Sequence, residues 1–106
     1  MSDIKKLLGK RIKELRTAKR YTQEYLAELT GLGSTSISKI ENGLYHPTDD
    51  NLDKISKALD VEPYKLYKYD HLRSPSEMRN ILHEKINKLQ DSELSTIYKV
   101  VNELVD

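Results

Sequence analysis

The sequence predicts an all-α fold, with a five-helix domain over residues 1–69, a connector at 70–73 and a C-terminal two-helix hairpin over 74–106. Apolar residues recur at intervals of three and four along most of the chain, as in helices with one buried face. No stretch alternates apolar and polar residues for long enough to form a useful strand. A length of 106 residues suits one compact domain with a short addition, so we do not expect two full domains.

The first two helices are marked by residues that cap helix ends. Asp3 is suited to cap a helix that ends near Lys19, and Thr22 is suited to cap a short second helix. The segment from Gly31 to Gly33 should end this second helix. The inward stripe of the first helix is Ile4, Leu7, Leu8, Ile12 and Leu15. The inward residues of the second helix are Leu26, Ala27 and Leu29.

A third helix is expected over about residues 34–42, and Gly43 suits a left-handed end. Four of its first five residues carry hydroxyl groups, although Ser and Thr are only moderate helix formers. On a helical wheel, Ile37 and Ile40 point to one side. The residues on the opposite side are Thr35, Ser38, Lys39 and Asn42.

Two further helices complete the predicted domain. Pro47 separates the third helix from a fourth, which begins at the cap Thr48. Pro63 suits the first position of a short fifth helix. The expected core contacts of this part are Leu52, Ile55, Leu59, Val61, Leu66 and Tyr67.

The C-terminal hairpin begins with a capping box, in which Ser74 is the cap, Pro75 the first helical residue and Glu77 the residue that reaches back. Its second helix is expected after the segment QDSE, residues 90–93. The two apolar stripes are too small to hold a core alone, so they must pack on another surface. The candidate contact residues are Met78, Ile81, Leu82, Ile86, Leu94, Ile97, Tyr98, Val101 and Leu104.

The sequence lacks the residues that several classes of function require. Cysteine is absent, which excludes disulfides, thiolate metal sites and a cysteine nucleophile. The segment HEKIN lacks the second histidine of a zinc-protease motif, and GLGSTS lacks the third glycine of a dinucleotide-binding motif. We therefore expect no catalytic site, no metal and no cofactor. No apolar run approaches the about 20 residues of a membrane helix, so we expect a cytoplasmic protein without a membrane partner.

The polar side of the third helix predicts contact with a large polar surface. A helix this short gains little from intrinsic propensity, so its neighbours must hold it. Short hydroxyl side chains beside one lysine can approach base edges and phosphates in the major groove of B-DNA. Residues 1–47 are also the basic part of the chain, with nine Lys and Arg against five Asp and Glu. The alternative is an ordinary solvated helix face.

The residues around this helix have the spacing of a helix-turn-helix. Counted from Gln23, Ala27 at the fifth position permits a close helix crossing, and Gly31 at the ninth permits a tight turn. Ile37 and Ile40 would then fix the second helix of the motif to the core. The segments IKELRTAKRYTQEYLAELTG, SISKIENG and PTDDNLDKISKALDVEPYKLY resemble the phage repressor and Cro-like (Xre) helix-turn-helix family of transcriptional regulators, over about residues 4–67.

The resemblance implies that helix 34–42 binds in the major groove of DNA. Contacts with base edges are implied for Ser34, Thr35, Ser38 and Lys39. Contacts with the DNA backbone are implied for Gln23 and Asn42. Tyr45 is a further candidate for a backbone contact, and its ring could instead pack at the helix junction.

An ion pair between Arg16 and Glu41 is also implied, and we interpret it as structural because both residues flank the core on the helical wheel. Two positions depart from the family pattern. Gly33 stands where Ser or Thr usually caps the recognition helix, and Ser34 could cap a helix that starts one residue later. Arg20 stands where Gly often closes the first helix, and it could contact phosphate or remain solvated.

These observations predict a regulator of transcription that is not an enzyme. We expect a repressor that binds a palindromic operator in double-stranded DNA as a homodimer, formed through the C-terminal hairpin. Two other surfaces remain open for the hairpin, namely its own domain and a regulatory protein. The rival function is a protein-interaction module, such as an antitoxin or a regulatory subunit, that acts through the hairpin.

Overall fold

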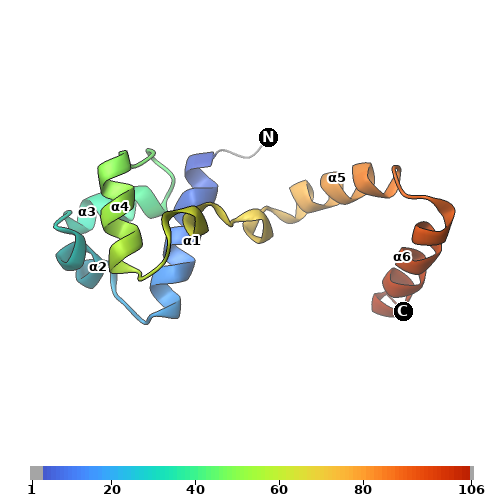
Figure 1. The fold of residues 1–106 in the computed structure, drawn as a ribbon, viewed down its shortest axis with the longest axis horizontal. Helices are drawn as coiled ribbons and strands as arrows, with labels where there is room; N and C mark the ends of the chain where they lie inside the picture. Colours follow the sequence, from blue (N-terminus) through green and yellow to red (C-terminus); the bar gives the residue numbers. More distant parts are fainter. Residues whose placement is uncertain (1–3, 106) are drawn as a thin grey trace. The chain divides into compact units, whose positions relative to one another are not determined.

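The structure is a computed structural model that describes residues 4–105 (Figure 1). No strand occurs in this range, so the predicted all-α fold is confirmed. The chain separates into two units, residues 1–73 and 74–106, and each is described by itself. The elements of the first unit are α1 (Ile4–Ala18), α2 (Gln23–Thr30), α3 (Ser34–Glu41), α4 (Asp49–Ala58) and the 3-10 turns η1 (Pro63–Tyr67) and η2 (Asp70–Leu72). Those of the second unit are α5 (Pro75–Ile86) and α6 (Asp91–Leu104).

Two of the predicted helix caps are present in the first unit. The hydroxyl of Thr22 accepts a hydrogen bond from the backbone N–H of Tyr25, and that of Thr48 accepts one from Asn51. The predicted cap Asp3 lies outside the described residues. Because α3 already begins at Ser34, its N-cap is Gly33, which has no side chain to offer. The expectation that Ser34 would cap this helix is therefore wrong.

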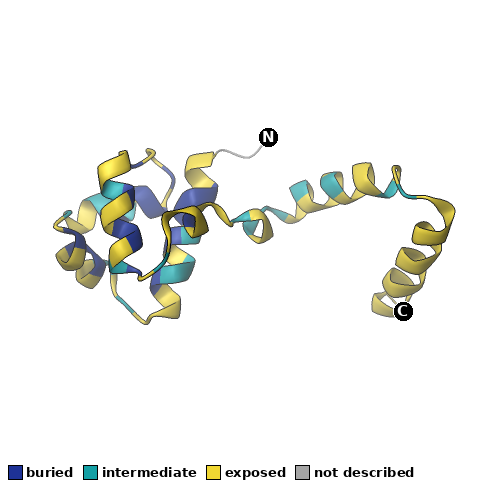
Figure 2. Ribbon diagram, viewed as in Figure 1, coloured by how far each residue is buried: buried dark blue, intermediate teal, exposed yellow. Residues whose placement is uncertain are grey.

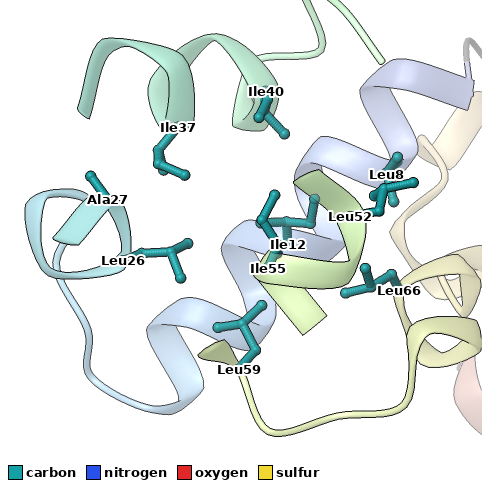
Figure 3. Close-up of a cluster of buried hydrophobic side chains, with 10 residues drawn as sticks. All are labelled: Leu8, Ile12, Leu26, Ala27, Ile37, Ile40, Leu52, Ile55, Leu59 and Leu66. Atoms are coloured by element: carbon teal, nitrogen blue, oxygen red, sulfur yellow. The ribbon is translucent and has the colours of Figure 1, made fainter. Parts of the chain in front are cut away.

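One cluster of buried side chains holds the first unit together. Figure 3 shows Ile37 and Ile40 of α3 pointing into the same cluster as the apolar residues of α1, α2 and α4. Each of these elements buries one apolar stripe, which is the arrangement that the intervals of three and four predicted. The members are Leu8, Ile12, Leu26, Ala27, Ile37, Ile40, Leu52, Ile55, Leu59 and Leu66.

Three residues predicted to face the core are exposed. Leu29 is 46% exposed, because Thr30 takes the inward place on α2 and its hydroxyl donates to the backbone carbonyls of Leu26 and Ala27. Tyr67 is 44% exposed, because its neighbour Leu66 fills the core from η1. Ile4 lies one turn before the buried part of α1 and is also exposed.

A glycine inside α1 sets how closely α1 and α3 approach each other. A Cβ atom on Gly9 would lie 2.3 Å from the backbone oxygen of Ile40 and 2.7 Å from that of Glu41. Real side chains do not tolerate such distances, so the two helices can cross this closely only over a residue without a side chain. Gly9 therefore fixes the depth at which α3 sits on the core.

The second unit consists of two well-capped helices with little burial. Ser74 caps α5 by accepting from the backbone N–H of Glu77, as predicted. Gln90 and Glu93 form a capping box for α6, which places QDSE at the start of this helix rather than before it. Neither helix contains a buried residue (Figure 2). Among the candidate contact residues, Ile81 and Ile86 are half-buried. The exposed candidates are Met78, Leu82, Leu94, Ile97, Tyr98, Val101 and Leu104.

Candidate nucleic-acid interface

Helix α3 buries one side completely and presents the other to solvent. Ile37 and Ile40 are almost fully buried, whereas Ser34, Thr35 and Lys39 on the other side are exposed. The side chains that point outward are small or flexible, and Lys39 is the cation among them. This face can therefore approach a large polar surface without a bulky side chain in the way.

The end of α3 is fixed by a left-handed glycine. Gly43 has a φ of 73°, and its backbone N–H donates to the carbonyl of Ile40. The N–H of the next residue, Leu44, donates to the carbonyl of Lys39 at 3.0 Å. These two bonds form a Schellman motif, which satisfies carbonyls that the helix leaves unpaired. A Cβ on Gly43 would lie 2.7 Å from Cα of Lys6, so this turn also packs tightly against α1.

The exposed face of α3 and the start of α2 line one shallow, open depression. It brings together six of the seven residues for which a DNA contact was predicted, namely Gln23, Ser34, Thr35, Ser38, Lys39 and Asn42. The seventh, Tyr45, does not line it, and its hydroxyl donates to the backbone carbonyl of Ser36 at 3.4 Å. The depression also contains Glu24 and Leu44, which sequence analysis did not single out. Their signal was adjacency to Gln23 and Gly43, which is too weak to select them in advance.

A buried ion pair joins α1 to α3 beneath this face. The Nε atom of Arg16 donates to Oε2 of Glu41 at 2.6 Å, and its Nη2 donates to Oε1 at 3.0 Å. The third nitrogen of the guanidinium donates to the carbonyl of Tyr21. The hydrogen bonds to the Glu41 carboxylate raise the pKa of Arg16 above its usual value, so the guanidinium stays charged. This two-point contact orients α3 on α1.

Gln23 connects this ion pair to the depression. Its side-chain amide donates to Oε1 of Glu41 at 3.0 Å, and the residue is half-buried. Glu41 therefore accepts from α1 and from the first residue of α2 at the same time. The arrangement fixes the start of α2 relative to α3, which is the relation that a helix-turn-helix requires.

Arg20 occupies a position with unusual backbone geometry after α1. Its φ is 60°, in the left-handed region that Gly adopts most easily, and its side chain is exposed. The family pattern often has Gly at this place. Arg20 therefore adopts a backbone conformation that suits glycine better than arginine.

The described residues offer neither a metal site nor a membrane-spanning helix. Within residues 4–105, no group of three or more His, Asp and Glu side chains could hold a metal ion. No helix in that range is long and apolar enough to cross a membrane.

Comparisons with known proteins agree with the helix-turn-helix arrangement of α2 and α3. A helix-turn-helix family model matches residues 12–66. The control protein C.BamHI of Bacillus amyloliquefaciens is 41% identical over 66 residues, which cover 61% of the chain and 82% of the relative. The transcriptional regulator ImmR of Bacillus subtilis is 32% identical over 89 residues, which cover 81% of the chain and 70% of the relative.

Solved structures of a controller protein and a repressor are also similar to this chain. The restriction-modification controller protein C.AhdI of Aeromonas hydrophila has a TM-score of 0.57 and 41% identity, covering 57% of this chain and 92% of that one. The P22 c2 repressor, solved in complex with a synthetic operator, has a TM-score of 0.56 and 33% identity, covering 59% and 96% of the two chains.

Proposed function

The chain belongs to the helix-turn-helix family of transcriptional regulators, and we propose that it binds a palindromic operator in double-stranded DNA as a homodimeric repressor. The observation that carries the proposal is the depression in which the polar face of α3 meets the first residue of α2. Its solved relative, the P22 c2 repressor, was crystallised with an operator. The family consists of transcription regulators rather than enzymes.

In this proposal, α3 enters the major groove and its exposed residues contact base edges. The hydroxyl groups of Ser34, Thr35 and Ser38 can both donate and accept, so they fit several bases. Lys39 can only donate, which favours the two acceptors that guanine presents in the major groove. Specificity should therefore depend most strongly on Lys39.

Contacts with the DNA backbone would position α3 in the groove. Gln23 and Asn42 both line the depression, and each carries an amide that can donate to phosphate oxygens. The Asn42 amide already donates to the Ser38 hydroxyl at 3.4 Å, a long bond that DNA could replace. Tyr45, although outside the depression, follows α3 closely enough to remain a candidate for a phosphate contact.

We propose that α5 and α6 form the dimer. The exposed residues of α6 at 94, 97, 98, 101 and 104 follow the intervals of three and four of one continuous helix face. Two such faces can bury each other by the isologous contact that symmetric dimers use. Dimerisation would also double the number of phosphate contacts, which a small domain needs for strong binding.

The dimer can be tested by sedimentation at tens of micromolar protein. We expect a dimer for the wild type and a monomer for Ile97→Glu/Val101→Glu, because both charges would lie on the apolar face. The matched control is Thr96→Glu, which adds a charge to the other side of α6 and should remain dimeric. A monomeric wild type, or a double variant that remains dimeric, would refute this role.

The DNA-binding function can be tested by selecting bound sequences from a random duplex pool at a fixed salt concentration. The wild type should enrich a palindrome whose half-sites lie about 34 Å apart, close to one helical turn. The Thr35→Ala/Lys39→Ala variant should lose this enrichment while it keeps its helical circular dichroism. If the folded wild type enriches no sequence, the interaction-module function would replace the proposal, and α5 and α6 would be the surface to examine.

A further inference from the structure

Leu44 is an exposed apolar residue inside the candidate DNA interface. It lines the same depression as Lys39 and Asn42, and the other seven lining residues are all polar. Its side chain is 64% exposed, and it takes no part in the core cluster. A single exposed leucine is ordinary on a protein surface. Leu44, however, lies among the polar residues of the candidate DNA interface, so its contribution to DNA binding can be tested.

The backbone holds Leu44 in a fixed place. Its N–H is bonded to the carbonyl of Lys39, and the preceding Gly43 is buried against α1. In a Schellman motif, the residue at this position usually packs its apolar side chain on a residue one turn earlier in the helix. Those residues are Ser38 and Lys39, which both belong to the polar face. The helix end therefore positions the leucine without supplying the usual apolar neighbour.

We infer that Leu44 contacts the C5-methyl group of a thymine and so helps to determine the operator sequence. This inference rests on the proposed function. The major groove of B-DNA presents one apolar group on its base edges, and that group is the thymine methyl. A leucine at the edge of a helix that enters this groove gains stability by burying its side chain against such a methyl. Leu44 thereby favours thymine over the other three bases at one position of each half-site.

The test combines a protein change with a DNA change. The operator obtained by selection is made with each thymine of one half-site replaced in turn by uracil, which removes the methyl and keeps the base pair. Equilibrium dissociation constants are measured for the wild type and for Leu44→Ala. The matched control is Leu29→Ala, since Leu29 is also exposed but does not line the depression. Thr35→Ser is a second control, because the methyl of Thr35 could contact a thymine itself.

We expect one thymine whose replacement weakens wild-type binding about fourfold, the effect of exposing one methyl-sized group. Leu44→Ala should bind the unmodified operator more weakly and lose sensitivity to that replacement, whereas both controls should keep it. Equal sensitivity in the wild type and Leu44→Ala would overturn the inference, and so would a wild type that is insensitive at every thymine. A selection that yields no operator would instead overturn the proposed function. Since Leu44 is exposed, thermal unfolding should show that the variant remains folded.

Discussion

Replacing Gly9 by alanine tests the close crossing of α1 and α3. Alanine ordinarily stabilises the middle of a helix by about 0.5–1 kcal/mol relative to glycine. Here its Cβ would lie 2.3 Å from the carbonyl oxygen of Ile40, so the two helices must separate by about 1 Å to reach ordinary contact. Overpacking typically costs about 1–3 kcal/mol, and because backbone atoms cannot rotate away, we expect the cost here at the upper end of this range or above it. The net loss of unfolding free energy should therefore be about 2 kcal/mol or more.

The assay is urea denaturation followed by circular dichroism, with linear extrapolation to water. Gly33→Ala is the matched control, because Gly33 has a φ of −71° and no atom lies within 4 Å of the added Cβ. This variant should lose at most about 1 kcal/mol, the cost of alanine instead of glycine at the N-cap of α3. The melting temperature of Gly9→Ala should fall by about 8–16 °C. If Gly9→Ala proves as stable as the wild type, α3 does not pack on α1 in the way described.

Three further substitutions test other features of the first unit. Glu41→Leu should cost about 3–5 kcal/mol of unfolding free energy by leaving Arg16 buried without its partner, and Arg16→Met/Glu41→Leu should recover most of this in the same urea assay. Gly33→Ser supplies the missing cap of α3 and should raise stability by a few tenths of a kcal/mol, seen as a higher urea midpoint; an unchanged or lower midpoint would contradict the cap geometry. Partial burial acts to raise the pKa of Glu14, but hydrogen bonds from His71 and a neighbouring arginine outweigh it and hold this pKa below its usual 4.5. The contribution of ionised Glu14 to stability is therefore present above pH 4.5 and is lost as the pH falls through the lowered pKa. Glu14→Gln should be less stable than the wild type at about pH 6 and equally stable in strong acid. A stability difference between the two proteins that is the same at about pH 6 and in strong acid would contradict this.

Most of the fold could be predicted from signals within single helices, namely capping residues and the spacing of apolar residues. The caps Thr22, Thr48 and Ser74 placed three helix starts, because each hydroxyl satisfies a backbone N–H that the helix itself cannot. Ile37 and Ile40 were identified as core residues because their spacing puts them on one side of α3. These signals act within one turn of helix, so they can be recognised without knowledge of the neighbours.

Features that depend on neighbouring elements escaped the sequence analysis. Periodicity does not say whether Leu29 or Thr30 faces inward, since a Thr whose hydroxyl bonds to its own helix can also be buried. In the sequence, Gly9 indicates only a lower helix propensity within α1. Its role in the close crossing appears only when the position of the α3 backbone is known. The place of Leu44 in the depression likewise depends on the turn at Gly43, which brings it back beside α3.

The candidate site was found because its residues belong to one helix face. The residues of α3 could be grouped on a helical wheel, and the resemblance added Gln23 from the preceding helix α2. The bond from Gln23 to Glu41 could not be anticipated, because it requires the relative position of α2 and α3. This bond gives Gln23 a structural part in addition to the proposed DNA contact.

The most direct test of the central claim compares affinities for the selected operator and a scrambled duplex at the same salt concentration. If Lys39 contacts a base, Lys39→Ala should weaken operator binding by about 1–3 kcal/mol and reduce the preference for operator over scrambled DNA. The control Lys54→Ala removes an exposed lysine from α4 and should leave this preference unchanged. If Lys39→Ala keeps the full preference of the wild type, α3 is not the element that recognises the sequence.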